Sequence, residues 1–202
     1  KVIETQGGLT GLPNRTPIKS KEINNAVKVS DVNSHVSLLK RNGKVLTWGF
    51  NINGDLGTVK PEKHIIVPTQ IAYDGLAVDI SGRQLLSDNH EIWRWGLQYY
   101  DVGGIRVTRY PYENTATKLY DDSAGQQIFS GGGPRGLVGI SIDENGCLES
   151  WGYTNSGQRG DGSRNFQKLF FNDERVKLKY KSIKAGGKAL CIQMEMNNEM
   201  LF

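Results

Sequence analysis

Short hydrophobic stretches alternate with turn residues along the chain, and this pattern predicts β-strands joined by tight turns. Residues 36–39 (VSLL) and 45–48 (VLTW) form one such pair of stretches. Asn42-Gly43 lies between them and favours a hairpin, since both residues tolerate positive φ. The turn signal recurs at Asn145-Gly146 and, in weaker form, at Asn89-His90 and Asn197-Asn198.

A strict alternation of polar and apolar positions marks residues 175–184 (RVKLKYKSIK). The period of two places Lys177, Lys179 and Lys181 on one face of a strand. Lysines on an edge strand block unwanted pairing, so we expect a solvated outer strand here. The alternative is a contact surface for an acidic partner or an anionic membrane.

The dipeptide Trp-Gly recurs and divides the chain into repeats. The first two copies align without gaps as SHVSLLKRNGKVLTWG (residues 34–49) and SGRQLLSDNHEIWRWG (residues 81–96). A third copy ends at residue 152, and a fourth begins near residue 183. Downstream, WGFNINGDLGTV matches WGYTNSGQRGDG in length. The structural anchors of the repeat are therefore Trp48, Gly49, Gly54, Gly57, Trp95, Gly96, Trp151, Gly152, Gly157 and Gly160.

These motifs resemble the regulator of chromosome condensation repeat family, whose pattern ends a strand with Trp-Gly and continues Asn-x-x-Gly-Gln-Leu-Gly. The resemblance covers about residues 27–202, and the second copy departs most, since WGLQYYDVGG lacks the regular glycine spacing. It implies an all-β fold, a β-propeller built from four-stranded blades. The family usually has seven blades, whereas this length supplies about four.

We therefore expect a single propeller domain over residues 1–202, made of three repeats and one hybrid blade from both termini. The expected repeats are 27–75, 76–125, 126–178 and 179–202, with 1–26 completing the last blade. The alternative is part of a larger propeller, whose open faces would favour self-association.

Composition suits a soluble globular protein, with 37 % hydrophobic and 23 % charged residues. Glycine is abundant, at 25 residues, as many tight turns require. A net charge of +4 does not indicate nucleic-acid binding, and no apolar run approaches the ~20 residues of a transmembrane helix. We expect Cys147 and Cys191 to be buried free thiols, with a single disulfide as the alternative.

Catalytic and metal-binding signatures are weak in this sequence. His35, His64 and His90 fall at different repeat positions, and the cysteines lack zinc spacing. The glycine-rich stretch SGGGPRG (residues 130–136) lacks the Gly-Lys-Ser/Thr ending of a phosphate loop. We therefore favour a non-catalytic protein and expect no cofactor and no metal.

An insertion between the second and third copies is the best candidate for a binding surface. It lies within residues 97–122, and it is rich in tyrosine and arginine, which are common at binding hot spots. Loops that break a repeat often carry function. The alternative is that the tyrosines pack between blades. The candidate residues are Tyr99, Tyr100, Arg106, Arg109, Tyr110 and Tyr112.

Two functions from different classes follow from these features. The first is a recognition or adhesion module on a secreted or surface-exposed bacterial protein, with a protein or glycan partner. The second, implied by the resemblance, is a guanine-nucleotide exchange factor for a Ran-like small GTPase, as in bacterial effectors acting in the host cytosol. No segment matches the wedge that such exchange requires, so the second ranks lower. An inhibitor or scaffold that caps an enzyme is a third possibility.

The tripeptide Arg159-Gly160-Asp161 is found in many integrin ligands, but here it falls within the repeat. Residues 157–160 occupy the Gly-Gln-Leu-Gly slot, and Arg159 stands where the first copy has Leu56. We therefore interpret the tripeptide as a product of the repeat, with Arg159 turned outward or paired with a carboxylate.

Overall fold

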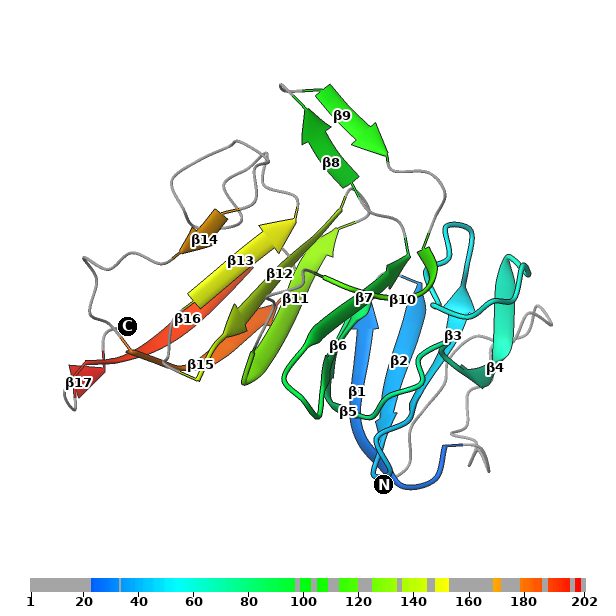
Figure 1. The fold of residues 1–202 in the computed structure, drawn as a ribbon, viewed down its shortest axis with the longest axis horizontal. Coiled ribbons are helices and arrows are strands. Elements are labelled where there is room, and N and C mark those ends of the chain that lie inside the picture. The colour runs from blue at the N-terminus through cyan, green and yellow to red at the C-terminus, as the bar shows by residue number, and fades with distance from the viewer. Residues whose placement is uncertain are drawn as a thin grey trace, which may run out of the picture.

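The computed structural model is built from antiparallel strands and loops, with no helix in the part of the chain that it describes. The first and last strands of the chain lie in sheets at opposite ends of the molecule (Figure 1). The described residues are 23–32, 34–96, 99–102, 105–108, 113–119, 125–133, 136–144, 148–152, 169–171, 179–186, 189–196 and 199–200.

Four sheets follow one another along the chain, and a separate hairpin is inserted in the second. The first has the order β1-β2-β3-β4 and consists of β1 (Ala26–Val32), β2 (His35–Lys40), β3 (Val45–Phe50) and β4 (His64–Gln70). The second has the order β10-β7-β6-β5 and consists of β5 (Ala77–Ser81), β6 (Gln84–Ser87), β7 (Ile92–Gly96) and β10 (Glu113–Lys118).

The third sheet has the order β11-β12-β13-β14 and consists of β11 (Gln127–Gly133), β12 (Gly136–Ile142), β13 (Leu148–Gly152) and β14 (Leu169–Phe171). The fourth consists of β15 (Lys179–Gly186), β16 (Ala189–Met196) and β17 (Glu199–Met200), in that order. The hairpin pairs β8 (Tyr99–Val102) with β9 (Ile105–Thr108). The predicted all-β class is confirmed.

The turn between β2 and β3 differs in one detail from the sequence-based expectation. Gly43 has a φ of 76°, but Asn42 is not among the described residues with positive φ. The N–H of Gly43 donates to the carbonyl of Lys40, and the N–H of Lys40 donates to that of Lys44. This is the three-residue loop in which only the last residue is left-handed, so one glycine suffices. His90, with a φ of 67°, takes the same place between β6 and β7.

Two hydrophobic clusters form the core, and each lies between neighbouring sheets. One cluster contains Leu39 and Val45 of the first sheet and Ile71, which directly follows β4. These residues pack against the second sheet, at Ala77, Ile80, Leu85 and Trp95. The other cluster contains Leu86 and Ile92 of the second sheet and Leu119, which directly follows β10. These residues pack against the third sheet, at Ile128 and Trp151. Each of these tryptophans therefore faces the preceding sheet, as adjacent propeller blades require.

The first strand of each sheet lies at the inside of the arrangement. β5 contacts β1 and β2, β11 contacts β5 and β6, and β15 contacts β11 and β12. No comparable contact joins β15 to β1 among the described strands, so they form an open arc (Figure 1). β15 is an edge strand, as its lysine pattern predicts, but it lies at the inner edge beside β11 and not on the outside.

Several sequence-based predictions concern residues outside this description. Residues 1–22, expected to complete the last blade, are among them, as are Cys147, Lys177 and the tripeptide at 159–161. Asn145-Gly146, Asn197-Asn198, Gly157 and Gly160 also lie there. Cys191 lies in β16, opposite Lys184 of β15.

Candidate partner-binding surface

The β8–β9 hairpin is the feature that most clearly departs from the repeating sheets. The chain leaves the second sheet after β7, forms the hairpin, and returns to the same sheet as β10. Figure 1 shows the hairpin projecting beyond the sheets, away from the end at which the N-terminal strand begins. A protruding element with its own strand pairing is well placed to meet another molecule.

The corresponding connection in the first sheet, residues 51–63, is held tightly to its own blade. The side-chain amide of Asn51 donates to the carbonyls of Lys60 and Glu62, each at 3.1 Å. Its Oδ1 accepts from the N–H of Leu56 at 3.0 Å. The hydroxyl of Thr47 donates to the Leu56 carbonyl at 2.6 Å. These bonds hold the loop in place, because each gives a hydrogen-bond partner to a backbone group that packing would otherwise leave unsatisfied.

The same loop also forms part of the seam with the second sheet. The indole N–H of Trp95 donates to the backbone carbonyl of Asp55 at 3.0 Å. Gly57 has a φ of 62°, and a Cβ there would lie 2.6 Å from Cγ of Trp95. Only glycine therefore allows the loop to approach the Trp95 ring this closely.

A buried ion pair lies at this seam, between Arg83 of the second blade and Asp55 of the loop. His35, at the start of β2, is buried beside them. Burial, and next the charge of Arg83, lower the pKa of His35 from 6.5 to about 4. The imidazole is consequently neutral at physiological pH.

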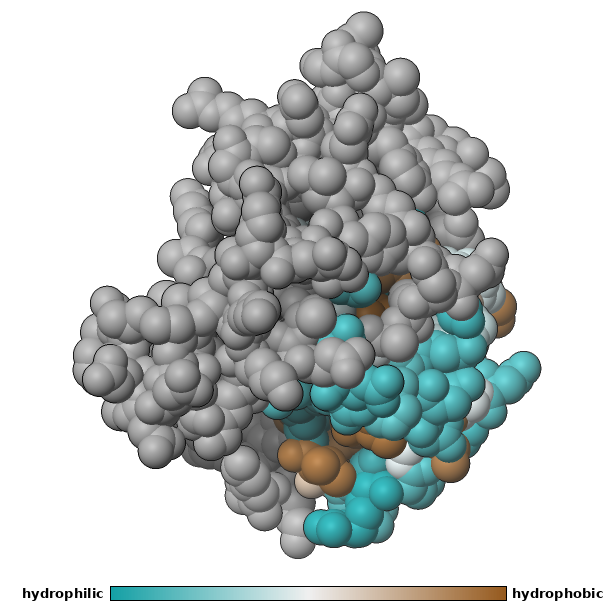
Figure 2. Space-filling view, turned by 60° about the vertical axis from the view of Figure 1, so that its left-hand side comes forward, coloured by the Kyte–Doolittle hydropathy of each residue, from teal (hydrophilic) through white to brown (hydrophobic). Residues whose placement is uncertain are grey.

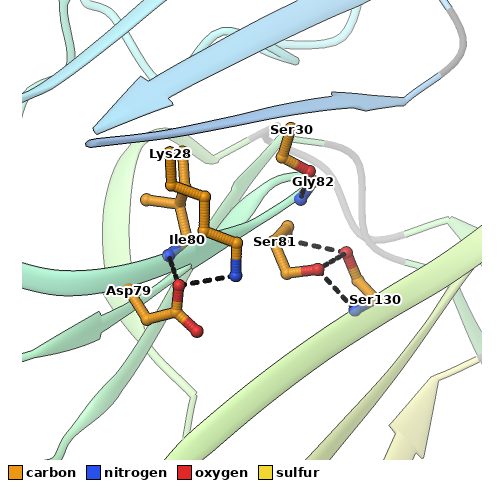
Figure 3. A network of polar contacts seen from close by, with 7 residues as sticks. All are labelled: Lys28, Ser30, Asp79, Ile80, Ser81, Gly82 and Ser130. Atoms are coloured by element: carbon orange, nitrogen blue, oxygen red, sulfur yellow. Dashed lines mark hydrogen bonds and ion pairs between the residues drawn. The ribbon is translucent and has the colours of Figure 1, made fainter. Parts of the chain in front are cut away.

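A line of polar contacts joins the inner strands of the first three sheets (Figure 3). Lys28 of β1 pairs with Asp79 of β5 at 2.6 Å, and the hydroxyl of Ser30 accepts from the N–H of Gly82 at 2.8 Å. Ser130 of β11 donates from its hydroxyl to the Ser81 carbonyl and from its N–H to the Ser81 hydroxyl, both at 2.7 Å. These contacts align neighbouring blades, and we assign them a structural role.

The strand register of the hairpin separates its positions into two faces. Tyr99 pairs with Thr108, and Asp101 with Arg106, so these four positions share one face. Tyr100 pairs with Val107, and Val102 with Ile105, so these four share the other. One face thus combines a tyrosine position with three polar positions, and the other combines a tyrosine position with three aliphatic positions.

The structure brings together only part of the candidate set predicted from sequence. Tyr99, Tyr100 and Arg106 all lie on the hairpin, with Tyr100 on the opposite face from the other two. Arg109, Tyr110 and Tyr112 lie outside the described residues. Lys179 and Lys181 lie on β15, at the other end of the arc.

The strands of the hairpin were not anticipated, although the sequence carries a signal for them. The pairing of Val102 with Ile105 leaves two residues between the strands, and the sequence places Gly103-Gly104 there. A two-residue glycine loop between short alternating stretches is a recognised hairpin signal.

One stretch of the chain matches a known sequence repeat. Residues 42–82 match the sequence model of the regulator of chromosome condensation (RCC1) repeat. This stretch is therefore similar to one RCC1 repeat. The matched stretch runs from the β2–β3 turn to the end of β5, and it includes Trp48-Gly49 and the loop that packs on Trp95. The predicted resemblance to the RCC1 repeat family is thereby confirmed.

Solved structures extend the likeness in fold to most of the chain. Human WBSCR16 matches with a TM-score of 0.64 at 16 % identity, over 89 % of this chain and 48 % of its own. Prp20p from Saccharomyces cerevisiae matches with 0.60 at 16 % identity, over 89 % and 44 %. Yeast RCC1 (Prp20) bound to Kap60 matches with 0.59 at 17 % identity, over 88 % and 42 %. This chain thus spans less than half of the length of each RCC1-type structure.

The surface of the described part carries few features that suggest chemistry. The coloured residues in Figure 2 are mainly hydrophilic on this side, with some apolar side chains among them. No group of three or more His, Cys, Asp or Glu side chains in the described part is placed to hold a metal ion. The same part has no helix that is long and apolar enough to cross a membrane.

Proposed function

We propose that this chain is a non-catalytic recognition module that binds a protein partner through the β8–β9 hairpin. The observation that carries the proposal is the hairpin itself, which interrupts an RCC1-type blade and projects from it (Figure 1). In the corresponding loop of the first blade, Asn51 holds the N–H of Leu56, and the carbonyl of Asp55 accepts from the Trp95 indole of the second blade. Among the described strands, β8 and β9 pair only with each other.

A protein partner is supported by the structural neighbours. Prp20p is described with binding properties toward Gsp1p and histones, and yeast RCC1 is seen bound to Kap60. The apolar and aromatic face of the hairpin suits a protein surface better than a glycan, because it holds Tyr100 beside three aliphatic positions. A secreted or surface-exposed location remains part of the proposal.

The proposal is tested by quantitative capture from extracts with three versions of the chain. Tyr100→Ala together with Val107→Ala removes two opposite positions on one hairpin face. Arg41→Ala is the control, because it changes an exposed residue in the β2–β3 turn of another blade. We expect one protein to be retained by wild type and control and lost from the hairpin variant. Equal retention by all three, or binding only to a glycan array, would contradict the proposal.

A second candidate is exchange-factor activity on a Ran-like small GTPase. It is favoured by the fold shared with Prp20p, which binds Gsp1p. We expect sub-stoichiometric chain to accelerate nucleotide release from Gsp1p if this function holds. Release at the uncatalysed rate in the presence of excess chain would eliminate it.

A further inference from the structure

We propose that the seam between the first two blades is a pH-sensitive switch. A proton on His35 draws the carboxylate of Asp55 away from Arg83, and the loop at residues 51–63 then separates from the second blade. The proposal concerns the contacts between these two blades, and it depends neither on the hairpin nor on a bound partner.

One residue of the loop, Asp55, makes two polar contacts with the second blade. Its carboxylate pairs with Arg83, and the exposed fractions of the Asp55 and Arg83 side chains are 11 % and 8 %. Its backbone carbonyl accepts the indole N–H of Trp95 at 3.0 Å. A movement of Asp55 away from the second blade therefore breaks a side-chain contact and a main-chain contact together.

His35 is buried close to this pair and is held by its own sheet. It is 5 % exposed, and its Nε2 has no hydrogen-bond partner among the described residues. Its partner across the sheet is Gly49 of β3, where a Cβ would lie only 2.8 Å from Cα of His35. Since β2 and β3 are packed this closely, we expect the groups around the ring, and not its own strand, to move when the ring gains a proton.

Three charged side chains from three elements act on the His35 ring. Burial and Arg83 of the second blade disfavour the charged ring, whereas Asp55 of the loop and Asp31 of β1 favour it. Their net effect lowers the pKa of His35 to about 4 in the closed seam. Because Arg83 has the largest charge effect on the ring, a proton favours the arrangement in which Arg83 lies farther away and Asp55 turns to the ring.

The loop can leave the second blade and keep the contacts that give it its shape. The side chain of Asn51 bonds to the backbone of three other residues of the loop. The carbonyl of Gly57 accepts the N–H of Ala72, just after β4, at 2.8 Å. These bonds involve no strand of the second blade. Opening therefore uncovers Trp95, which is 0 % exposed in the closed seam.

The size of the pH response follows from the pKa of His35 in the two arrangements. The ring takes up a proton near pH 4 in the closed seam, and near its ordinary value of 6.5 once it is released. Above pH 6.5 the ring is neutral in both arrangements, so the opening equilibrium does not depend on pH there. Below this value opening becomes more favourable, by about thirtyfold at about pH 5 and by about 300-fold in the acid limit.

The test is hydrogen exchange of the Trp95 indole N–H, followed by nuclear magnetic resonance in the full chain at about pH 7.5 and about pH 5. We expect its protection, relative to free indole at the same pH, to fall about thirtyfold, while the backbone amides of β3 keep theirs. Constant protection of the indole would overturn the proposal. An equal loss in β3 would also overturn it, because the whole first sheet would then be opening.

Three variants assign the response. His35→Gln keeps a polar side chain that does not titrate and should abolish the acid response, whereas His64→Gln, at an exposed histidine of the same sheet, should retain it. Asp55→Asn keeps the backbone carbonyl but removes the carboxylate that pairs with Arg83, so indole protection should be at least about tenfold lower already at about pH 7.5. A full acid response in His35→Gln, or wild-type protection in Asp55→Asn, would contradict the switch.

Discussion

His35 lies buried at the start of β2, close to the charged pair of Asp55 and Arg83. Its Nε2 has no hydrogen-bond partner among the described residues. Burial and the guanidinium of Arg83 disfavour the imidazolium, and so the pKa falls to about 4. The place of His35 within the repeat could be read from the sequence. Its proximity to the guanidinium of Arg83 could not, because Arg83 belongs to the next blade.

Stability should therefore fall in acid. Unfolded His35 takes up a proton near pH 6.5, whereas the folded residue does so only near pH 4. Above pH 6.5, His35 is neutral in both the folded and the unfolded state and does not make stability depend on pH. Between pH 6.5 and 4, the unfolded state binds more protons at this residue and is stabilised relative to the folded state. The free energy of unfolding should fall by about 3 kcal/mol in total as the pH drops through this range.

Denaturant unfolding across this pH range checks the prediction. His35→Leu should remove this part of the acid dependence, while His64→Gln, at an exposed residue of β4, should retain it. Parallel pH profiles for wild type and His35→Leu would show that the histidine is not responsible.

At the scale of elements, the two connections after Trp-Gly have opposite roles. The loop at residues 51–63 uses Asn51, Gly57 and the carbonyl of Asp55 to hold two blades. The β8–β9 hairpin packs chiefly on itself among the described elements. The sequence located the insertion by its length, but the division of its positions into two faces required the register.

Removal of the hairpin should therefore cost little stability. Replacement of residues 99–108 by a short glycine-serine linker should leave the melting temperature within a few degrees of wild type. By contrast, Asn51→Ala leaves the buried N–H of Leu56 without its acceptor and should cost about 1–3 kcal/mol. Thermal melts followed by circular dichroism measure both; a large loss on hairpin removal would mean that it supports the blade.

At the scale of the whole molecule, each sheet contacts its neighbours in sequence, with β15 on β11, β11 on β5 and β5 on β1. Such an arrangement distributes stability over successive seams, as in repeat proteins. The first seam combines a hydrophobic cluster, an indole hydrogen bond and a buried ion pair. The described strands of the fourth sheet, β15–β17, supply none of these contacts.

Removal of residues 179–202 should thus leave the first two blades folded. We expect amide hydrogen exchange in β2, β3, β6 and β7 to stay slow, while exchange in β11 and β12 speeds up because β15 no longer covers them. Mass spectrometry of peptides resolves these strands. Uniform loss of protection would indicate that the arc folds only as one unit.

The sequence alone determined the repeats and their hairpins, because Trp-Gly spacing and turn residues are local signals repeated along the chain, and the resemblance to the RCC1 repeat implied that these repeats form propeller blades. It determined the strand pairs on either side of Asn42-Gly43 and Asn89-His90 for the same reason. Only the tertiary structure decided which sheet each tryptophan faces and that Asp55 meets Arg83. Those outcomes depend on packing between blades, which relates residues far apart in sequence and leaves no local pattern.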